Sequence, residues 1–131
     1  MAKHLAVAVL LAASSLSCLA QESAEYRACN EKAVAQPELN ACADAEAKRM
    51  DAELNKVYQQ VLAGAKDDAD ATAKIKAAER AWVAYRDAYL EAMYPAKDKQ
   101  AEYGSMYLME VALLRAKLTR QQIAALKDLM Q

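Results

Sequence analysis

Histidine and cysteine, the side chains that most often supply nucleophiles, proton transfer and metal ligands, are scarce in this chain. Its 131 residues contain one histidine, His4, and three cysteines, Cys18, Cys29 and Cys42. Catalytic groups of the Ser-His-Asp or Cys-His kind need a histidine, and zinc sites usually take histidine or cysteine. Because His4 and Cys18 fall in the first twenty residues, the chemistry left to the rest of the chain depends on what that segment is.

The first twenty residues have the pattern of a secretory signal peptide. Lys3 is followed by an apolar run at 5–13 and by small residues up to Ala20, and such a run is too short to span a bilayer. We expect cleavage after Ala20, which gives a periplasmic or secreted product without histidine. A lipoprotein signal would need an aliphatic residue three positions before Cys18, where Ser15 stands, so lipid attachment is the less favoured alternative.

Cys29 and Cys42 remain as a pair after this cleavage. An oxidising compartment would close them into a disulfide, which ties the first predicted helix across the turn at Pro37 to the second. A loop of this length contributes about 3 kcal/mol on the chain-entropy model. A redox role would favour a Cys-x-x-Cys spacing, so we predict a structural disulfide.

Composition predicts one helical domain in residues 21–131. The whole chain has 17 basic and 18 acidic residues, with only two glycines and two prolines, which is typical of helices. Without Lys3 the net charge is −2 (16 basic minus 18 acidic residues). There is no basic stripe, so nucleic acid is not an expected partner. No second apolar run is long enough to span a membrane, and we expect no cofactor.

Apolar residues that recur every three or four positions predict a small antiparallel bundle of about four helices, an all-α fold. The expected helical regions are 21–34, 39–65, 68–93 and 105–117, with a restart at 119. A capping-box pattern of Thr119 and Gln122 indicates that restart. The third region carries an apolar stripe that we expect to face the core, formed by Ile75, Ala78, Trp82, Tyr85, Tyr89 and Met93.

Arg86 lies about 60° from the centre of that stripe, where a guanidinium needs an acceptor or a path to water. Asp51 and Asn55 lie at the edge of the apolar face of the second helix. We therefore predict a polar clamp in which Arg86 bonds Asp51 or Asn55, sheltered by Tyr58 and Tyr85. We expect the clamp to fix the register of the two helices rather than to bind a ligand.

The acidic residues do not predict a metal site or a hydrolase. Asp68 and Glu79 have the spacing of the first and last ligands of a calcium loop, but Ala73 stands where the loop needs glycine and two lysines lie inside it. Capping of the third helix by Asp68 or Asp70 explains these aspartates better. Hydrolysis by carboxylates alone needs two acids across a cleft, whereas Asp44 and Asp87 fall away from the apolar stripes. We expect no catalytic residue.

The polar connection at 95–105 is a better candidate for recognition. Three tyrosines surround this connection, and a glycine and a serine form its turn: Tyr94, Tyr103 and Tyr107, with Gly104 and Ser105. Exposed tyrosines give a large contact area at a small entropic cost, which predicts contact with a protein partner. In the alternative interpretation, which the sequence leaves equally open, the rings fold back over the end of the bundle.

Several motifs of the chain recur together in a known family. They are Cys29…Leu39-Asn40-Ala41-Cys42, Asp51-x-x-Leu54-Asn55-x-x-Tyr58, Ala81-Trp82-x-x-Tyr85-Arg86-Asp87-Ala88, Gly104-Ser105 and Leu118-Thr119. Together they resemble the lysozyme inhibitor LprI-like N-terminal domain family, over nearly all of 21–131. The resemblance implies a small exported helical domain that binds a protein partner without catalysis, with lysozyme inhibition as the family's founding activity. The alternative is an envelope protein-interaction module that does not act on lysozyme.

The chain departs from the family pattern in three places. Leu90 and Leu114 stand where members often carry a second cysteine pair, which implies an apolar contact between their helices. Gln122 stands where arginine is common. One glycine, rather than two, precedes Ser105.

Overall fold

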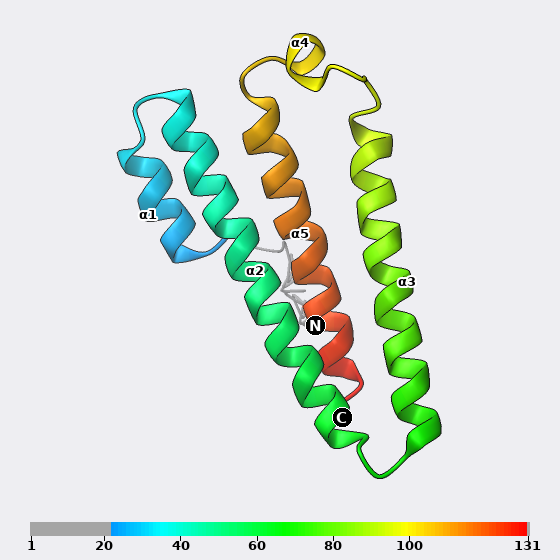
Figure 1. Cartoon of the computed structure of the whole chain (residues 1–131). Helices are drawn as coiled ribbons and strands as arrows, with labels where there is room; N and C mark the ends of the chain where they lie inside the picture. Colours follow the sequence, from blue (N-terminus) through cyan, green and yellow to red (C-terminus); the bar gives the residue numbers. More distant parts are fainter. Residues whose placement is uncertain (1–21, 131) are drawn as a thin grey trace, which may run out of the picture.

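The computed structural model describes residues 22–130, and every regular element in that part of the chain is a helix. The helices are α1 (Ala24–Lys32), α2 (Gln36–Gly64), α3 (Ala69–Met93), α4 (Lys99–Tyr103) and α5 (Tyr107–Asp128) (Figure 1). The predicted all-α fold is confirmed. The predicted signal peptide, with His4 and Cys18, lies outside the described residues. None of the described helices is long and apolar enough to cross a membrane.

Side-chain caps and a proline explain where the helices begin. Ser23, Asp68 and Asp98 each accept a hydrogen bond from the backbone N–H three residues ahead, which satisfies a donor that the first turn leaves free. Of the two predicted caps for α3, Asp68 is the cap, and Asp70 lies in the first turn of the helix. Helix α2 has no side-chain cap but has Pro37 in its first turn, where the missing N–H costs no helical bond.

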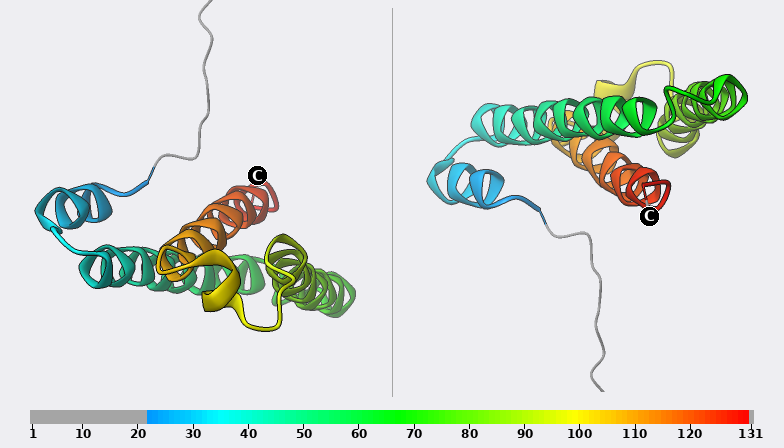
Figure 2. Two further views of the ribbon diagram at one scale, coloured as in Figure 1. Left: turned by 90° about the horizontal axis from the view of Figure 1, so that it is seen from above. Right: turned by 90° about the horizontal axis from the view of Figure 1, so that it is seen from below.

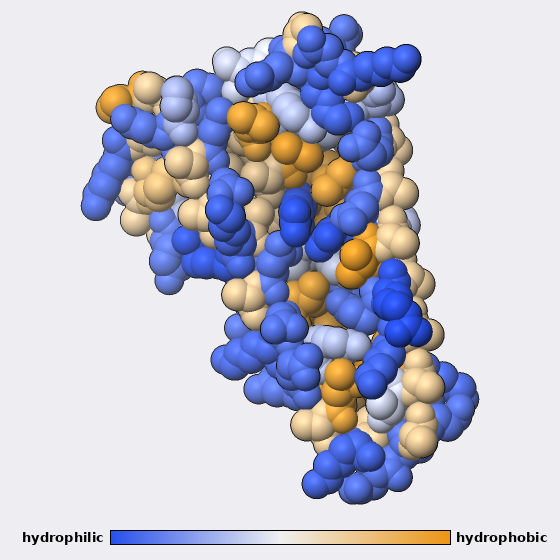
Figure 3. Space-filling model, viewed as in Figure 1, coloured by the Kyte–Doolittle hydropathy of each residue, from blue (hydrophilic) through white to orange (hydrophobic). Residues whose placement is uncertain are grey.

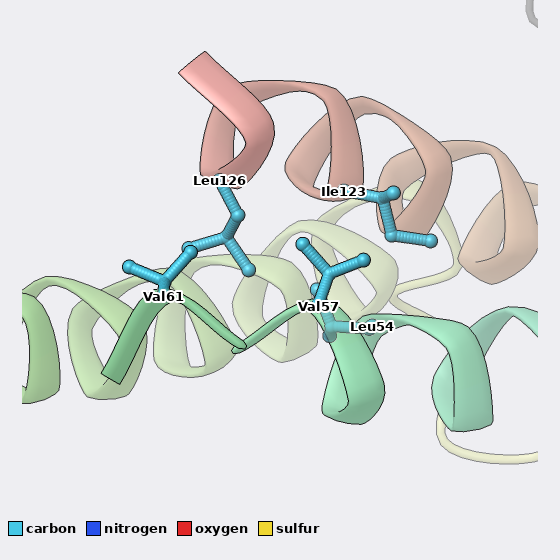
Figure 4. Packing of buried hydrophobic residues seen from close by; sticks show 5 residues of the cluster. All are labelled: Leu54, Val57, Val61, Ile123 and Leu126. Carbon is cyan, nitrogen blue, oxygen red and sulfur yellow. The ribbon is translucent and has the colours of Figure 1, made fainter. Parts of the chain in front are cut away.

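The core lies between α2 and α5, which pack along most of their length. At the end near the C-terminus, five buried side chains interdigitate (Figure 4): Leu54, Val57, Val61, Ile123 and Leu126. They lie three and four residues apart on α2 and three apart on α5, so each helix presents one apolar face to the other. Full burial of such a side chain contributes roughly 2 kcal/mol relative to exposure.

The predicted disulfide joins α1 to α2. The Cα atoms of Cys29 and Cys42 are 5.7 Å apart, and Cys42 is buried beside Tyr26 and Ala43. The partly buried Met109 of α5 packs against this cluster. The disulfide therefore fastens α1 beside the N-terminal half of α2, at one side of the molecule (Figures 1 and 2).

Helix α5 is continuous, so the predicted restart at Thr119 is wrong. Thr119 lies in the middle of the helix and has no exposed surface. No proline or glycine interrupts the helix here, and burial of Thr119 in the interior favours an unbroken backbone ladder. Gln122, the expected capping partner, instead bonds a side chain of α3.

Helix α3 packs with a different face from the predicted one. Tyr85, Tyr89 and Met93 are 56%, 36% and 50% exposed, whereas Glu79 and Arg86 are buried. Gln122 of α5 donates to the Glu79 carboxylate at 2.8 Å, so a polar contact holds this part of α3 to α5. The prediction that the apolar stripe of α3 faces the core is therefore wrong for its C-terminal half.

Candidate functional site

A groove of about 650 Å³ lies between α2 and α3, with α5 as its floor. Seen along the bundle, α2 and α3 stand on one side of α5 (Figure 2). The groove is lined by Asn40, Ala41, Asp44, Ala47, Lys48, Asp51, Leu90, Leu108, Val111, Ala112 and Arg115. Figure 3 shows hydrophobic side chains gathered in the hollow between these helices, with hydrophilic ones around them.

Helical periodicity places these residues on one surface. On α5, positions 108, 111, 112 and 115 follow the steps that bring side chains to one face. They give the groove an apolar floor that ends in a cation, Arg115. Leu108 remains 47% exposed, and an exposed apolar patch rimmed by polar groups is a mark of interaction sites.

Asp51 is the centre of a charged group at the inner end of the groove. Arg115 Nη2 lies 2.5 Å from one carboxylate oxygen of Asp51, and Arg86 Nη1 lies 3.7 Å from the other. Arg86 has a shorter contact with its neighbour Asp87, at 2.8 Å. Its guanidinium also lies 5.2 Å from the ring centre of Trp82, a cation–π contact. Asp51 thus links all three long helices.

The other residues named for the clamp lie elsewhere. Asn55 is exposed on α2. The prediction that Tyr85 shelters the ion pair is wrong, since Tyr85 is 56% exposed, and Tyr58 packs against the α2–α5 core. Sequence reasoning missed Arg115, although its seven-residue spacing from Leu108 on the same helical face was a usable signal.

A second charged cluster surrounds Glu46, on the other side of α2 from the groove. Glu46 has no exposed surface. Its carboxylate accepts hydrogen bonds from the backbone N–H and the hydroxyl of Ser23, from Arg49 Nη2 at 2.8 Å and from Arg120 Nη1 at 2.7 Å. These contacts hold the residues just before α1, 22–23, which we call the N-terminal arm, against α2 and α5.

Hydrogen bonding determines the protonation state of Glu46. Burial alone would raise the pKa of this carboxyl, but the hydrogen bonds from Ser23 and Arg49, with the charge of Arg49, lower the pKa below its ordinary value. Glu46 is therefore a carboxylate whose charge is balanced by Arg49 and Arg120, which suits a structural role. Sequence reasoning missed Glu46. The available signal was its place three residues after Ala43 and four before Met50, within the apolar stripe of α2.

The predicted recognition loop folds inward. The ring of Tyr94 makes edge contacts with Tyr103 and Tyr107, with centroids 5.3 and 5.1 Å apart. Ala96 N–H donates to the Tyr103 hydroxyl at 3.1 Å. Burial raises the pKa of Tyr94, as expected for a ring partly removed from water. The rings thus cover the end of the bundle below α4, as in the second interpretation of the loop.

Gly104 makes the turn of this loop possible. Its φ of 76° and ψ of −168° fall in a region open almost only to glycine. The turn ends α4 and leads past the exposed Ser105 into α5. The loop therefore positions the start of α5, and with it Leu108 on the floor of the groove.

The chemistry that this arrangement supports is binding by surface contact. The two most deeply buried carboxylates, Glu46 and Glu79, are each held by arginine, serine or glutamine donors. Within residues 22–130, no group of three or more histidine, cysteine or acidic side chains is placed to hold a metal ion. The groove offers an apolar floor with a charged rim.

Comparison with known proteins identifies relatives of the chain. A family model described as "Lysozyme inhibitor LprI" matches residues 29–126, from the first cysteine of the disulfide to the last residue of the α2–α5 core. The chain is 40% identical to an uncharacterized protein of Rhizobium meliloti (strain 1021), over 76% of this chain and 77% of that protein. No solved structure matches the chain.

Proposed function

Because the chain belongs to the lysozyme inhibitor LprI family, we propose that it is an exported, non-catalytic protein that binds lysozyme and blocks its action. Export follows from the predicted removal of residues 1–20. The disulfide Cys29–Cys42 suits the periplasm or the extracellular space, where disulfides persist.

The groove between α2 and α3 is the observation that supports binding through a surface of this chain. Its floor combines the half-exposed Leu108 with smaller apolar side chains, and apolar cores with polar rims are typical of protein interfaces. A segment that projects from the partner would bury the floor. The groove, rather than the inward-folded tyrosines, is therefore the binding surface in this proposal.

The rim can adapt to a partner at small cost. Asp44 and Lys48 pair with each other at 2.7 Å, with side chains 60% and 75% exposed. Exposed ion pairs contribute at most about 1 kcal/mol, so either group can exchange its partner for a charge on the bound protein. Asp51, held by Arg115, stays in place at the inner end and fixes the shape of the groove.

An inhibition assay tests the proposed activity. Lysozymes of several types digest cell walls in the presence of increasing amounts of the purified protein. We expect saturable slowing of digestion by at least one type. If none is slowed, the inhibitor proposal is wrong and the envelope protein-interaction module is favoured. Sugar release by the protein alone would contradict the absence of catalysis.

A pair of leucine variants tests the groove. Leu108→Glu places a charge on the floor, and we expect inhibition weaker by at least about tenfold. Leu129→Glu is the matched control, because Leu129 is 58% exposed and lies outside the groove at the end of α5. Equal inhibition by the two variants would exclude the groove as the binding surface without excluding the activity.

Export has its own test. Cell fractionation and intact mass should give a periplasmic or secreted species that begins at Gln21. A cytoplasmic species that keeps residues 1–20 would contradict export, and an added lipid mass on Cys18 would support the lipoprotein alternative.

A further inference from the structure

The connection between α1 and α2 carries the most exposed large hydrophobic side chain of residues 22–130. Val34 is 91% exposed, whereas the next in order, Leu129, is 58% exposed. The connection, whose residues 33–35 we call the corner loop, forms an outer corner of the molecule (Figure 1), and Figure 3 shows hydrophobic atoms at this corner. One exposed aliphatic side chain is common on protein surfaces, but this one stands on a backbone that is firmly held.

Hydrogen bonds hold each residue of the corner loop. The N–H of Ala33 donates to the Cys29 carbonyl at 3.2 Å, and the N–H of Val34 donates to a carboxylate oxygen of Glu38 at 2.7 Å. The N–H of Glu38 in turn donates to the Ala35 carbonyl at 3.0 Å. The disulfide between α1 and α2 closes the base of the loop. The loop is therefore ordered before a partner binds, which lowers the entropic cost of binding.

The corner loop is narrow and carries no charge. Alanines stand on both sides of Val34, in extended backbone conformation, and residues 33–37 include no charged side chain. Ala33 is partly buried against the cluster of Tyr26 and Cys42, so the valine projects alone. A β-branched side chain has few rotamers to lose on burial. A projection of this kind fits a concave surface that has room for one aliphatic side chain.

We propose that the corner loop enters the substrate cleft of the bound lysozyme and that Val34 is the side chain that fills it. This inference rests on the proposed function. An inhibitor stops digestion most directly by keeping the polysaccharide out of the enzyme's substrate site, and such sites are concave. The groove between α2 and α3 is itself concave, so it can receive a projection from lysozyme but cannot fill the cleft. The corner loop has the shape that the groove lacks.

The corner loop and the floor of the groove lie at the same end of the molecule. Gln36 follows the loop directly, and its Nε2 atom lies 3.9 Å from Met109 Sδ in the first turn of α5. Leu108, the exposed side chain of the groove floor, is the neighbour of Met109. One lysozyme molecule that covers this end can therefore contact Leu108 while its cleft holds Val34.

Valine variants test the corner loop in the cell-wall digestion assay. Val34→Ala removes two methyl groups and should weaken inhibition by about tenfold. Val34→Glu would bury a charge in the cleft and should weaken inhibition by at least about a hundredfold. Val83→Ala is the matched control, because Val83 is also an exposed valine but lies on α3 outside the groove; we expect inhibition to stay unchanged. Circular dichroism checks that each variant is folded.

Kinetics with a short, soluble oligosaccharide substrate test whether the cleft itself is occupied. We expect the unmodified protein to raise the KM of lysozyme for this substrate and to leave kcat unchanged. Inhibition of cell-wall digestion without inhibition of the soluble substrate overturns the inference, because the cleft would then be open. Equal inhibition by Val34→Glu and the unmodified protein also overturns it, and the proposed function stands in both cases. If the unmodified protein slows no lysozyme, the proposed function and this inference both fail.

Discussion

Glu46→Gln tests the buried ionic contacts that hold the N-terminal arm, α2 and α5 together. The carboxylate accepts hydrogen bonds from Ser23, Arg49 and Arg120 and has no exposed surface. An amide keeps the volume but removes the countercharge of both arginines and turns an NH₂ group toward their donors. Loss of one member of a buried ionic group costs about 3–5 kcal/mol. Because the Arg49 side chain is 35% exposed and regains water, we expect the lower value.

This loss is large enough to measure as a shift in melting temperature. An unfolding entropy of about 2.1 cal/mol/K per residue gives about 0.23 kcal/mol/K for a domain of about 110 residues. A loss of about 3 kcal/mol therefore lowers Tm by about 13 °C. Far-ultraviolet circular dichroism at neutral pH follows the transition.

Asp44→Asn is the matched control for Glu46→Gln. It makes the same change of charge two residues earlier on α2, but the Asp44 side chain is 60% exposed and pairs with Lys48. A surface pair of this kind contributes at most about 1 kcal/mol, so we expect Tm to fall by no more than about 4 °C. Equal shifts in the two variants would show that the buried contacts of Glu46 stabilise the fold no more than a surface ion pair does.

The stability of the protein at low pH gives an independent test of Glu46. The pKa of Glu46 is lower in the folded chain than its ordinary value of 4.5. Its contribution is therefore complete above that value and is lost as pH falls through the folded pKa. The free energy of unfolding of the unmodified protein should decrease over that range more than that of Glu46→Gln. Identical pH profiles would mean that Glu46 does not contribute in this way.

Three further variants test other parts of the structure. Asp51→Ala leaves two arginines without their shared acceptor and should lower the free energy of unfolding by about 1–3 kcal/mol. An unchanged melting curve would contradict a stabilising clamp at Asp51. Gly104→Ala should lower the free energy of unfolding, measured by denaturant titration, by about 1–3 kcal/mol. Gly64→Ala is its control: an added methyl group meets no atom within 4 Å there, so we expect no loss of stability. Leu90→Cys with Leu114→Cys should form a second disulfide and add about 3 kcal/mol; two free thiols after oxidation would argue against contact between these positions.

Local patterns in the sequence predicted the helices and the disulfide well, because caps, prolines and apolar periodicity act within a few residues. The face of α3 was predicted wrongly because periodicity identifies an apolar stripe but not its partner. Glu79 turns inward because Gln122 of α5 supplies a donor there. The restart at Thr119 failed because a capping-box pattern also occurs inside an unbroken helix.

The candidate site was less predictable because its contacts join distant segments. Glu46 meets Ser23 from 23 positions before it and Arg120 from 74 positions after it. Arg86 was correctly singled out as needing an acceptor, and it lies within 3.7 Å of Asp51. Arg115 of α5 bonds the same carboxylate. Predicting this contact requires knowing how three helices are placed relative to one another, and the spacing of residues within one helix does not give that placement.

Calorimetric titration of the purified protein into lysozymes of several types tests the proposed function most directly. We expect saturable binding of one lysozyme per chain for at least one type. The heat of binding should be lost in Leu108→Glu and kept in Leu129→Glu. Absence of binding to every type tested would contradict the proposal that this chain acts by binding lysozyme.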